Sequence, residues 1–199
     1  MASMQMPPSP RSGIAGLVLA AGAGSRFGLP KALVRDAAGR SWLQHAVEVL
    51  TTAGCSPVIV VLGARGAEAA ALLEPSASVL LVQAADWADG LSASLRAGLR
   101  CALDQPDLTA VAVIPVDVPD LNAATVARVI GTNSPPSVLR QARFAGRPGH
   151  PVVIGRAHWA SLMASAAGDS GAGAYLRAHT ARGIECGDLG TGVDVDRPT

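Results

Sequence analysis

The chain has 199 residues, of which 49% are hydrophobic, and its formal net charge is +1. A chain of this length is expected to fold as one domain, here residues 13–199, that buries roughly 70% of its unfolded surface. The absence of a cationic block and the small aromatic content, three Trp, two Phe and one Tyr, argue against nucleic-acid or membrane-surface binding. No apolar run reaches the roughly 18 residues of a membrane span.

The N-terminus and the cysteines suggest where the protein is found. Residues 1–12 contain three Met and three Pro but no apolar core, so we expect a flexible tail and not a signal peptide. The three cysteines, Cys55, Cys101 and Cys186, show neither metal-site spacing nor a disulfide framework. This usage fits a reducing compartment, and we expect a cytoplasmic protein.

Hydrophobic patterning predicts alternating strands and helices. Residues 14–20 are almost continuously apolar, as in a parallel strand buried on both faces. Ser41 is a candidate N-cap for a helix that ends at Gly54. Further strands are predicted at 57–62, 79–83 and 110–114, and helices at 67–73, 90–103 and 122–130. This order predicts an α/β, Rossmann-like fold with an open, mostly parallel sheet.

The pattern changes beyond residue 132. Residues 137–145 and 152–154 read as a β-hairpin joined by a tight connection at 146–149, and helices are expected near 158–166 and 171–179. About 50 residues are too few for a second domain. We therefore expect a small hairpin and helical flap that covers the crevice and supplies the side that binds the acceptor.

A glycine-rich loop follows the first strand. Gly22, Gly24 and Gly28 lie within seven residues, so the loop can adopt positive φ and bring backbone N–H groups close to an anion. Arg26 and Lys31 add two cations. The sequence therefore predicts a polyphosphate cradle, and a purely structural glycine turn is the alternative.

Two other phosphate-binding loops do not fit. A P-loop needs Gly-Lys-Ser/Thr, whereas Leu29 and Pro30 separate Gly28 from Lys31. A dinucleotide-binding loop needs G-x-G-x-x-G and an acid at the end of the second strand. In this chain the third glycine is one residue late and no acid follows the second strand until Glu68.

Acidic residues occur in two places that suit a cation. Asp117 follows the strand at 110–114 between two prolines, where it can bind a Mg²⁺ ion that bridges phosphate oxygens; helix capping, the alternative, suits Asp120 better. Asp194 and Asp196 lie on one face of an extended tail and would repel unless a cation lies between them. A solvated terminus is the alternative reading of that tail.

The start of the helix at 90–103 is a candidate site for the nucleotide. Gly90 and Ser92 open this helix, where free N–H groups and a hydroxyl can contact a base or ribose. Alternatively, Ser92 is only an N-terminal helix residue and Trp87 packs the loop.

The glycine loop, read as Leu19-Ala-Ala-Gly-x-Gly-x-Arg-x-Gly-x-Pro-Lys31, resembles the signature of the molybdenum-cofactor cytidylyltransferase and guanylyltransferase family. That family shares a fold with the sugar-nucleotide pyrophosphorylases, the nucleotide-diphospho-sugar transferase type. The resemblance implies Mg²⁺-dependent transfer of a nucleoside monophosphate from a triphosphate to a phosphate-bearing acceptor, with release of pyrophosphate. It further implies molybdopterin as acceptor and a possible molybdoenzyme partner.

The resemblance also implies roles for individual residues. Arg26, Lys31 and Asp117 would be catalytic. Asp117 would bind the metal together with Asp194 or Asp196, a choice left open because Arg197 replaces the usual Thr. Nucleotide binding would involve Leu19, Ala20, Ala21, Gly22, Gly24, Ser25, Arg26, Lys31, Gly90 and Ser92.

On the acceptor side, the segments Gly149-His150-Pro151 and Gly168-Asp169 resemble the family's acceptor-binding stretches, which makes His150 and Asp169 candidates. Gly173 stands where the family has an Arg, so that Arg177 or Arg147 would have to replace it.

The resemblance extends to the choice of nucleotide. Leu-Ala-Ala-Gly accompanies CTP in the family and Leu-Ala-Gly-Gly accompanies GTP, so Ala21 favours CTP, with GTP next. Two other functions remain open: a non-catalytic carrier of a nucleotide or of the molybdenum cofactor, and an NAD(P)H-dependent reductase. Sugar 1-phosphates remain possible acceptors.

Overall fold

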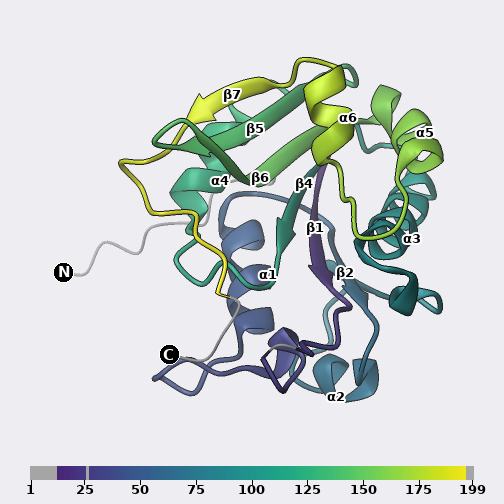
Figure 1. Ribbon diagram of the computed structural model, residues 1–199, viewed down its shortest axis with the longest axis vertical. Coiled ribbons are helices and arrows are strands. Elements are labelled where there is room, and N and C mark those ends of the chain that lie inside the picture. The colour runs from purple at the N-terminus through teal and green to yellow at the C-terminus, as the bar shows by residue number, and fades with distance from the viewer. Residues whose placement is uncertain (1–12, 26, 196–199) are drawn as a thin grey trace.

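The computed structural model describes residues 13–25 and 27–195 (Figure 1). The predicted N-terminal tail, Arg26 and Asp196 therefore lie outside the described residues. The fold is built on one seven-stranded sheet with the order β3-β2-β1-β4-β6-β5-β7. Its strands are Ile14–Ala20 (β1), Val58–Leu62 (β2), Val79–Gln83 (β3), Ala110–Pro115 (β4), Leu139–Phe144 (β5), Arg147–Gly155 (β6) and Arg182–Glu185 (β7).

The sheet is mostly parallel, as the sequence predicts. β1 pairs in parallel with β2 and with β4, β2 with β3, and β5 with β7. Only β6, among the described strands, runs antiparallel to both of its neighbours, β4 and β5. The predicted α/β fold class is confirmed.

Helices cover both faces of the sheet (Figure 1). The longer ones are Trp42–Thr52 (α1), Leu91–Leu103 (α3), Ala123–Ile130 (α4) and Arg156–Ser165 (α5); short ones are Lys31–Leu33 (η1), Gly66–Ala70 (α2), Trp87–Asp89 (η2) and Gly173–Ala178 (α6). Along β1, Val18 and Ala20 pack with α1 and α4, whereas Leu17 and Leu19 pack with α3 and α5. Because side chains of a strand alternate between faces, β1 contributes to both cores. No helix in the described ranges is long and apolar enough to cross a bilayer.

Two helices begin where the sequence predicts, for identifiable reasons. Ser41 forms a capping box with Gln44 at the start of α1: its Oγ accepts from the Gln44 N–H, and the Gln44 side chain accepts from the Ser41 N–H. Asn122 caps α4 by accepting from the Thr125 N–H at 3.0 Å. Asp120 therefore does not cap this helix.

The hairpin at the end of the sheet differs from the expectation. β6 pairs with β4 from Val152 to Gly155, so the hairpin extends the main sheet and is not a flap over the crevice. The tight turn lies at Ala145 and Gly146, both with positive φ, and residues 147–149 already belong to β6. Pro148 is compatible with a strand here because this part of β6 pairs with β5 alone. β7 was not predicted.

Gly98 provides a test of how closely α3 packs on the sheet. A Cβ at Gly98 would collide with Leu17 on β1 and lie 3.0 Å from Val61 Cγ2 on β2. We expect Gly98→Val to lower the free energy of unfolding by about 1–3 kcal/mol through overpacking, measured by urea denaturation. Arg100→Val, on the exposed side of α3, should change it by no more than about 0.5 kcal/mol. Equal losses in both variants would contradict this account of the packing.

Candidate functional site

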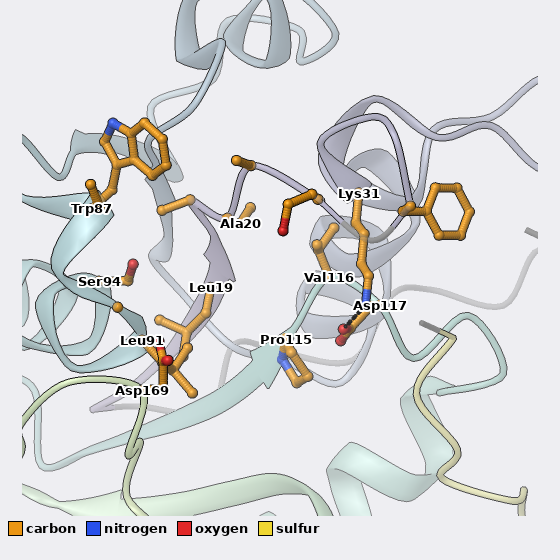
Figure 2. Close-up of a pocket in the computed structure, with 18 residues that line it drawn as sticks. Leu19, Ala20, Lys31, Trp87, Leu91, Ser94, Pro115, Val116, Asp117 and Asp169 are labelled. Atoms are coloured by element: carbon orange, nitrogen blue, oxygen red, sulfur yellow. Dashed lines mark hydrogen bonds and ion pairs between the residues drawn. The ribbon is translucent and has the colours of Figure 1, made fainter. Parts of the chain in front are cut away.

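A cleft of about 620 Å³ opens at the carboxyl ends of β1 and β4 (Figure 2). This volume lies within the range of small-molecule sites, about 300–1,000 Å³. Its wall near β1 consists of Leu19, Ala20, Ala21, Gly22, Ala23, Gly24, Ser25 and Phe27. The structure therefore places most described residues of the predicted glycine loop around one cavity, although Gly28 is not part of its lining.

The glycine loop is held in a tight turn. Gly24 has a φ of +63°, and a Cβ at this position would collide with the Leu29 carbonyl oxygen. The Gly24 carbonyl accepts hydrogen bonds from the N–H groups of Phe27 and Gly28, both at 2.8 Å. Gly22 and Ser25 remain exposed. A glycine at position 24 is thus required by the turn that directs the loop along the cleft.

An ion pair forms one side of the cleft. Lys31 Nζ lies 2.7 Å from Asp117 Oδ2, with 16% and 20% of the two side chains exposed (Figure 2). Lys31 comes from η1, directly after the glycine loop, and Asp117 from the loop after β4. Lys31, the predicted phosphate-binding cation, is therefore paired with Asp117, the predicted metal-binding carboxylate. Partial burial makes such a pair less screened by salt than a surface pair.

The opposite wall is formed by Trp87, Ala88, Gly90, Leu91, Ser94 and Asp169. Gly90 has a φ of +103°, and a Cβ there would lie 2.6 Å from Asp169 Oδ1. The Ser92 N–H donates to the Gly168 carbonyl at 3.0 Å. The start of α3 and the Gly168–Asp169 segment therefore pack directly on each other, and Figure 2 shows Trp87, Ser94 and Asp169 across the cleft from Lys31 and Asp117.

The serine that lines the cleft is Ser94 and not Ser92. Ser92 is 1% exposed, and its Oγ accepts a hydrogen bond from Arg96 at 3.2 Å. Ser92 is not among the residues that line the cavity, and its buried hydroxyl is bonded to Arg96. Ser94 is among the residues that line the cavity.

Arg96, on α3 next to this wall, is not part of the cavity lining and was not singled out in the sequence analysis. Besides Ser92, its guanidinium donates to the Ala166 carbonyl at 2.8 Å and lies 3.8 Å from Asp86 Oδ2. Arg96 thus ties α3 to the segments before Asp169 and before Trp87. The sequence signal that could have revealed Arg96 is the occurrence of a charged residue between Leu95 and Leu99, which are both buried.

The C-terminal segment approaches Asp117 from the other direction. The Val195 N–H donates to the Asp117 carbonyl at 2.9 Å, which brings Asp194 to this corner of the site. Nδ1 of His150 is buried and has no hydrogen-bond partner among the described residues. Burial lowers the pKa of His150, while the Val113 carbonyl and the carboxylates of Asp117 and Asp194 act in the opposite direction. His150 therefore lies beside the predicted metal ligands, although it does not line the cleft.

This corner fits a hard divalent cation shared with a substrate. Asp117 and Asp194 offer carboxylate oxygens, which Mg²⁺ and Mn²⁺ prefer. The described residues contain no group of three or more His, Cys, Asp or Glu that could hold a metal by themselves. Mg²⁺ commonly uses only one or two carboxylates and completes its coordination with water and substrate phosphates.

The two arginines considered as replacements at Gly173 lie outside the cleft lining. Arg177 Nη1 is 3.5 Å from where a Cβ of Gly173 would be, so its guanidinium lies over that position. Arg147 is exposed at the start of β6. Asp169, by contrast, is part of the cavity wall.

Comparison with known proteins agrees with this geometry. The family model described as "MobA-like NTP transferase domain" matches residues 16–183. The chain belongs to the MobA-like NTP transferase family. The match begins within β1 and ends within β7, so it includes at least part of each of the seven strands.

Individual relatives of this MobA-like chain have different names. It is similar to nicotine blue oxidoreductase of Paenarthrobacter nicotinovorans, with 34% identity over 194 residues and 92% of each chain covered. Rv0371c of Mycobacterium tuberculosis H37Rv has 27% identity and a TM-score of 0.74, covering 92% of this chain and 93% of its own. A further crystal structure of Rv0371c is a complex with manganese, with a TM-score of 0.67, 26% identity and coverage of 92% and 93%.

A nucleotidyl transferase from Methanothermobacter thermautotroptrophicus has 23% identity and a TM-score of 0.76, with 92% of each chain covered. At this identity the likeness shows the fold alone. The fold and the NTP transferase domain of this MobA-like chain are thus established, whereas its substrates are a matter for proposal.

His150 provides a pH test of the site in the metal-free protein. Its folded pKa lies below the unfolded value of about 6.5, so the unfolded state binds more protons as the pH falls. The stabilisation from neutral, buried His150 is therefore complete above about pH 6.5 and declines below it. We expect His150→Asn to flatten the dependence of the unfolding free energy on pH between 7 and 5, measured by urea denaturation with a chelator present. An unchanged dependence would contradict the burial of this ring.

Proposed function

We propose that this protein is a divalent-cation-dependent nucleotidyltransferase. It transfers a nucleoside monophosphate, CMP before GMP, from a nucleoside triphosphate to a phosphate-bearing acceptor of the molybdopterin type. The observation that carries the proposal is the ion pair between Lys31 and Asp117, which lies in one cavity with the glycine loop. Such a cavity combines the cation and amide groups that bind phosphates with the carboxylate that binds a metal.

The chain's own residues suit transfer by positioning and charge neutralisation. An acceptor phosphate oxygen attacks the α-phosphorus in line, a new P–O bond forms, and the bond to the β-phosphate breaks as pyrophosphate leaves. The loop amides, Lys31 and Arg26, which is outside the described residues, would hold the departing pyrophosphate. No side-chain nucleophile is needed for this reaction.

Asp117 and Asp194 would hold the cation, with Asp196, outside the described residues, as the alternative to Asp194, and Mg²⁺ is the ion we expect. When bound, it supplies positive charge that neutralises phosphate oxygens during transfer. Lys31 has to exchange the Asp117 carboxylate for a phosphate oxygen when nucleotide and cation bind. The manganese complex of Rv0371c supports a divalent cation in a related protein.

The wall formed by Trp87, Gly90 and Ser94 would contact the base and ribose, and Asp169 the acceptor. An indole ring and a serine hydroxyl offer stacking and one hydrogen-bonding group. The preference for CTP rests on Ala21 in the glycine loop and on the resemblance of this loop to the cytidylyltransferases. A molybdoenzyme that receives the product is a possible partner of such an enzyme.

A second candidate is an NAD(P)H-dependent reductase, because the 34% identical relative is named an oxidoreductase. The structure at the end of β2 argues against a reductase. Dinucleotide sites place a carboxylate there for the ribose, whereas here Trp87 packs on Gly63 and the Gln83 side chain donates to the Gly63 carbonyl at 3.1 Å. Glu68 is paired with Arg65. A non-catalytic carrier is a third possibility, suggested by the Gly at position 173.

Asp117→Asn tests the proposal. It removes the charge that binds the cation, and we expect pyrophosphate release from CTP in the presence of Mg²⁺ and molybdopterin-bound molybdenum to fall by at least about 10³-fold. Asp104→Asn, an exposed acid at the end of α3, should retain full activity. Near-normal release by folded Asp117→Asn would contradict the assignment. No release by the native protein with either CTP or GTP would favour the carrier, or, with NADPH oxidation, the reductase.

A further inference from the structure

Asp120 is committed to the C-terminal segment. Its Oδ2 accepts a hydrogen bond from the Thr191 N–H at 2.7 Å and another from the Thr191 hydroxyl at 2.6 Å. The two residues are 71 positions apart, and both are exposed. Hydrogen bonds to an ionised carboxylate are shorter and about twice as strong as those between neutral groups. This pair therefore holds the segment more firmly than a typical surface contact.

Further hydrogen bonds connect the contact between Asp120 and Thr191 with the backbone around Asp194. Thr191 Oγ1, which donates to Asp120, also accepts from the Val193 N–H at 3.3 Å. Gly192, between them, has a φ of +62°, and a Cβ there would collide with the Phe144 ring. Asp120 thus fixes a turn at residues 191–193, and Asp194 is the next residue. The Val195 N–H then bonds to the Asp117 carbonyl at 2.9 Å, so the chain is fastened on both sides of Asp194.

Other bonds guide the segment to this turn. Arg128 on α4 pairs with Asp188 through two nitrogens, at 2.5 and 2.8 Å, and the Asn122 side chain donates to the Leu189 carbonyl at 2.7 Å. In Figure 1 the yellow C-terminal segment leaves β7 and passes α4. These upstream bonds place Thr191 within reach of Asp120, but they end before the turn that presents Asp194.

Holding Asp194 beside Asp117 brings two carboxylates to one corner, of which Lys31 pairs with Asp117 alone. Like charges at one site repel, so a segment without restraint would carry Asp194 away. Asp120 belongs to the same loop as Asp117, three residues later. The loop after β4 therefore supplies one ligand directly and would orient the other through Thr191.

We propose that Asp120 is a positioning residue that preorganises the divalent-cation site by holding Thr191, and with it Asp194, against Asp117. The proposal rests on the proposed function for the identity of the site. Asp120 has no role as a helix cap, because Asn122 caps α4. Its two bonds to Thr191 connect it to the segment that carries Asp194.

The test measures Mn²⁺ binding directly, from the electron paramagnetic resonance signal of free Mn²⁺ in titrations without nucleotide. Groups that orient metal ligands typically contribute 10- to 100-fold to affinity, so we expect Asp120→Ala to raise the Kd for Mn²⁺ by about 10-fold or more. Thr191→Val removes the hydroxyl and keeps the backbone N–H, so its effect should be smaller. The double variant should be less impaired than the product of the two single effects, because both remove one interaction.

Asp104→Ala is the matched control, since it removes one exposed negative charge away from the site and should leave the Kd unchanged. A second readout does not depend on the metal: hydrogen exchange at the Val195 amide of the metal-free protein. We expect exchange there to be faster in Asp120→Ala, whereas amides of β1 and β4 should exchange at the native rate.

The outcomes separate this inference from the proposed function. Loss of Mn²⁺ binding in Asp117→Asn together with native binding in Asp120→Ala would overturn the positioning role alone. Native binding in Asp117→Asn would overturn the cation site of the proposed function, whereas no Mn²⁺ binding by the native protein would overturn the inference that the site is preorganised before nucleotide binds. In either case unchanged exchange at Val195 in Asp120→Ala would overturn the structural role of Asp120 as well, and faster exchange would support it.

Discussion

The parallel pairing of β1 with β4 is the constraint on which the site depends. The register pairs Leu19 with Pro115, and the Val116 N–H donates to the Leu19 carbonyl at 3.2 Å. Because both strands end at the same edge, the glycine loop and Asp117 emerge side by side. Lys31, one short helix beyond the loop, can then reach the Asp117 carboxylate. The placement of the glycine loop next to Asp117, on which the proposed phosphate and cation sites rest, is thus a consequence of strand order.

The remaining parts of the site come from distant segments that pack on this edge. Arg96 and Gly90 hold the Gly168–Asp169 segment against the start of α3, which closes one wall of the cleft. On the other side, Asp120 holds Thr191 and the C-terminal segment beside Asp117. In both places a polar side chain near the cavity positions a loop, while other residues line the cavity. Such support would give the precise placement of phosphates that the proposed transfer requires.

Local signals in the sequence were sufficient for much of the fold. The apolar run of β1 and the caps at Ser41 and Asn122 predicted elements that the structure confirms. The hairpin was misjudged because Pro148 and Gly149 are typical of turns, and only the partial pairing of β6 makes them acceptable in a strand.

The grouping of the candidate residues was predictable where they follow strand ends and less so where it depends on packing. The glycine loop, Lys31 and Asp117 were predicted from their positions after buried strands, and the structure brings them to one cavity. That Ser94 lines the cleft while Ser92 does not depends on packing at the start of α3, where the buried Ser92 hydroxyl is bonded to Arg96. The bond between Asp120 and Thr191 spans 71 residues and likewise has no local signal.

The most direct measurement of the central claim is the thermal stability of the protein with CTP, GTP or NADPH, each with and without Mg²⁺. The account predicts a selective, Mg²⁺-dependent stabilisation by CTP or GTP, of about 2.7 kcal/mol at 100 times the Kd; stabilisation by NADPH alone, independent of Mg²⁺, would contradict it.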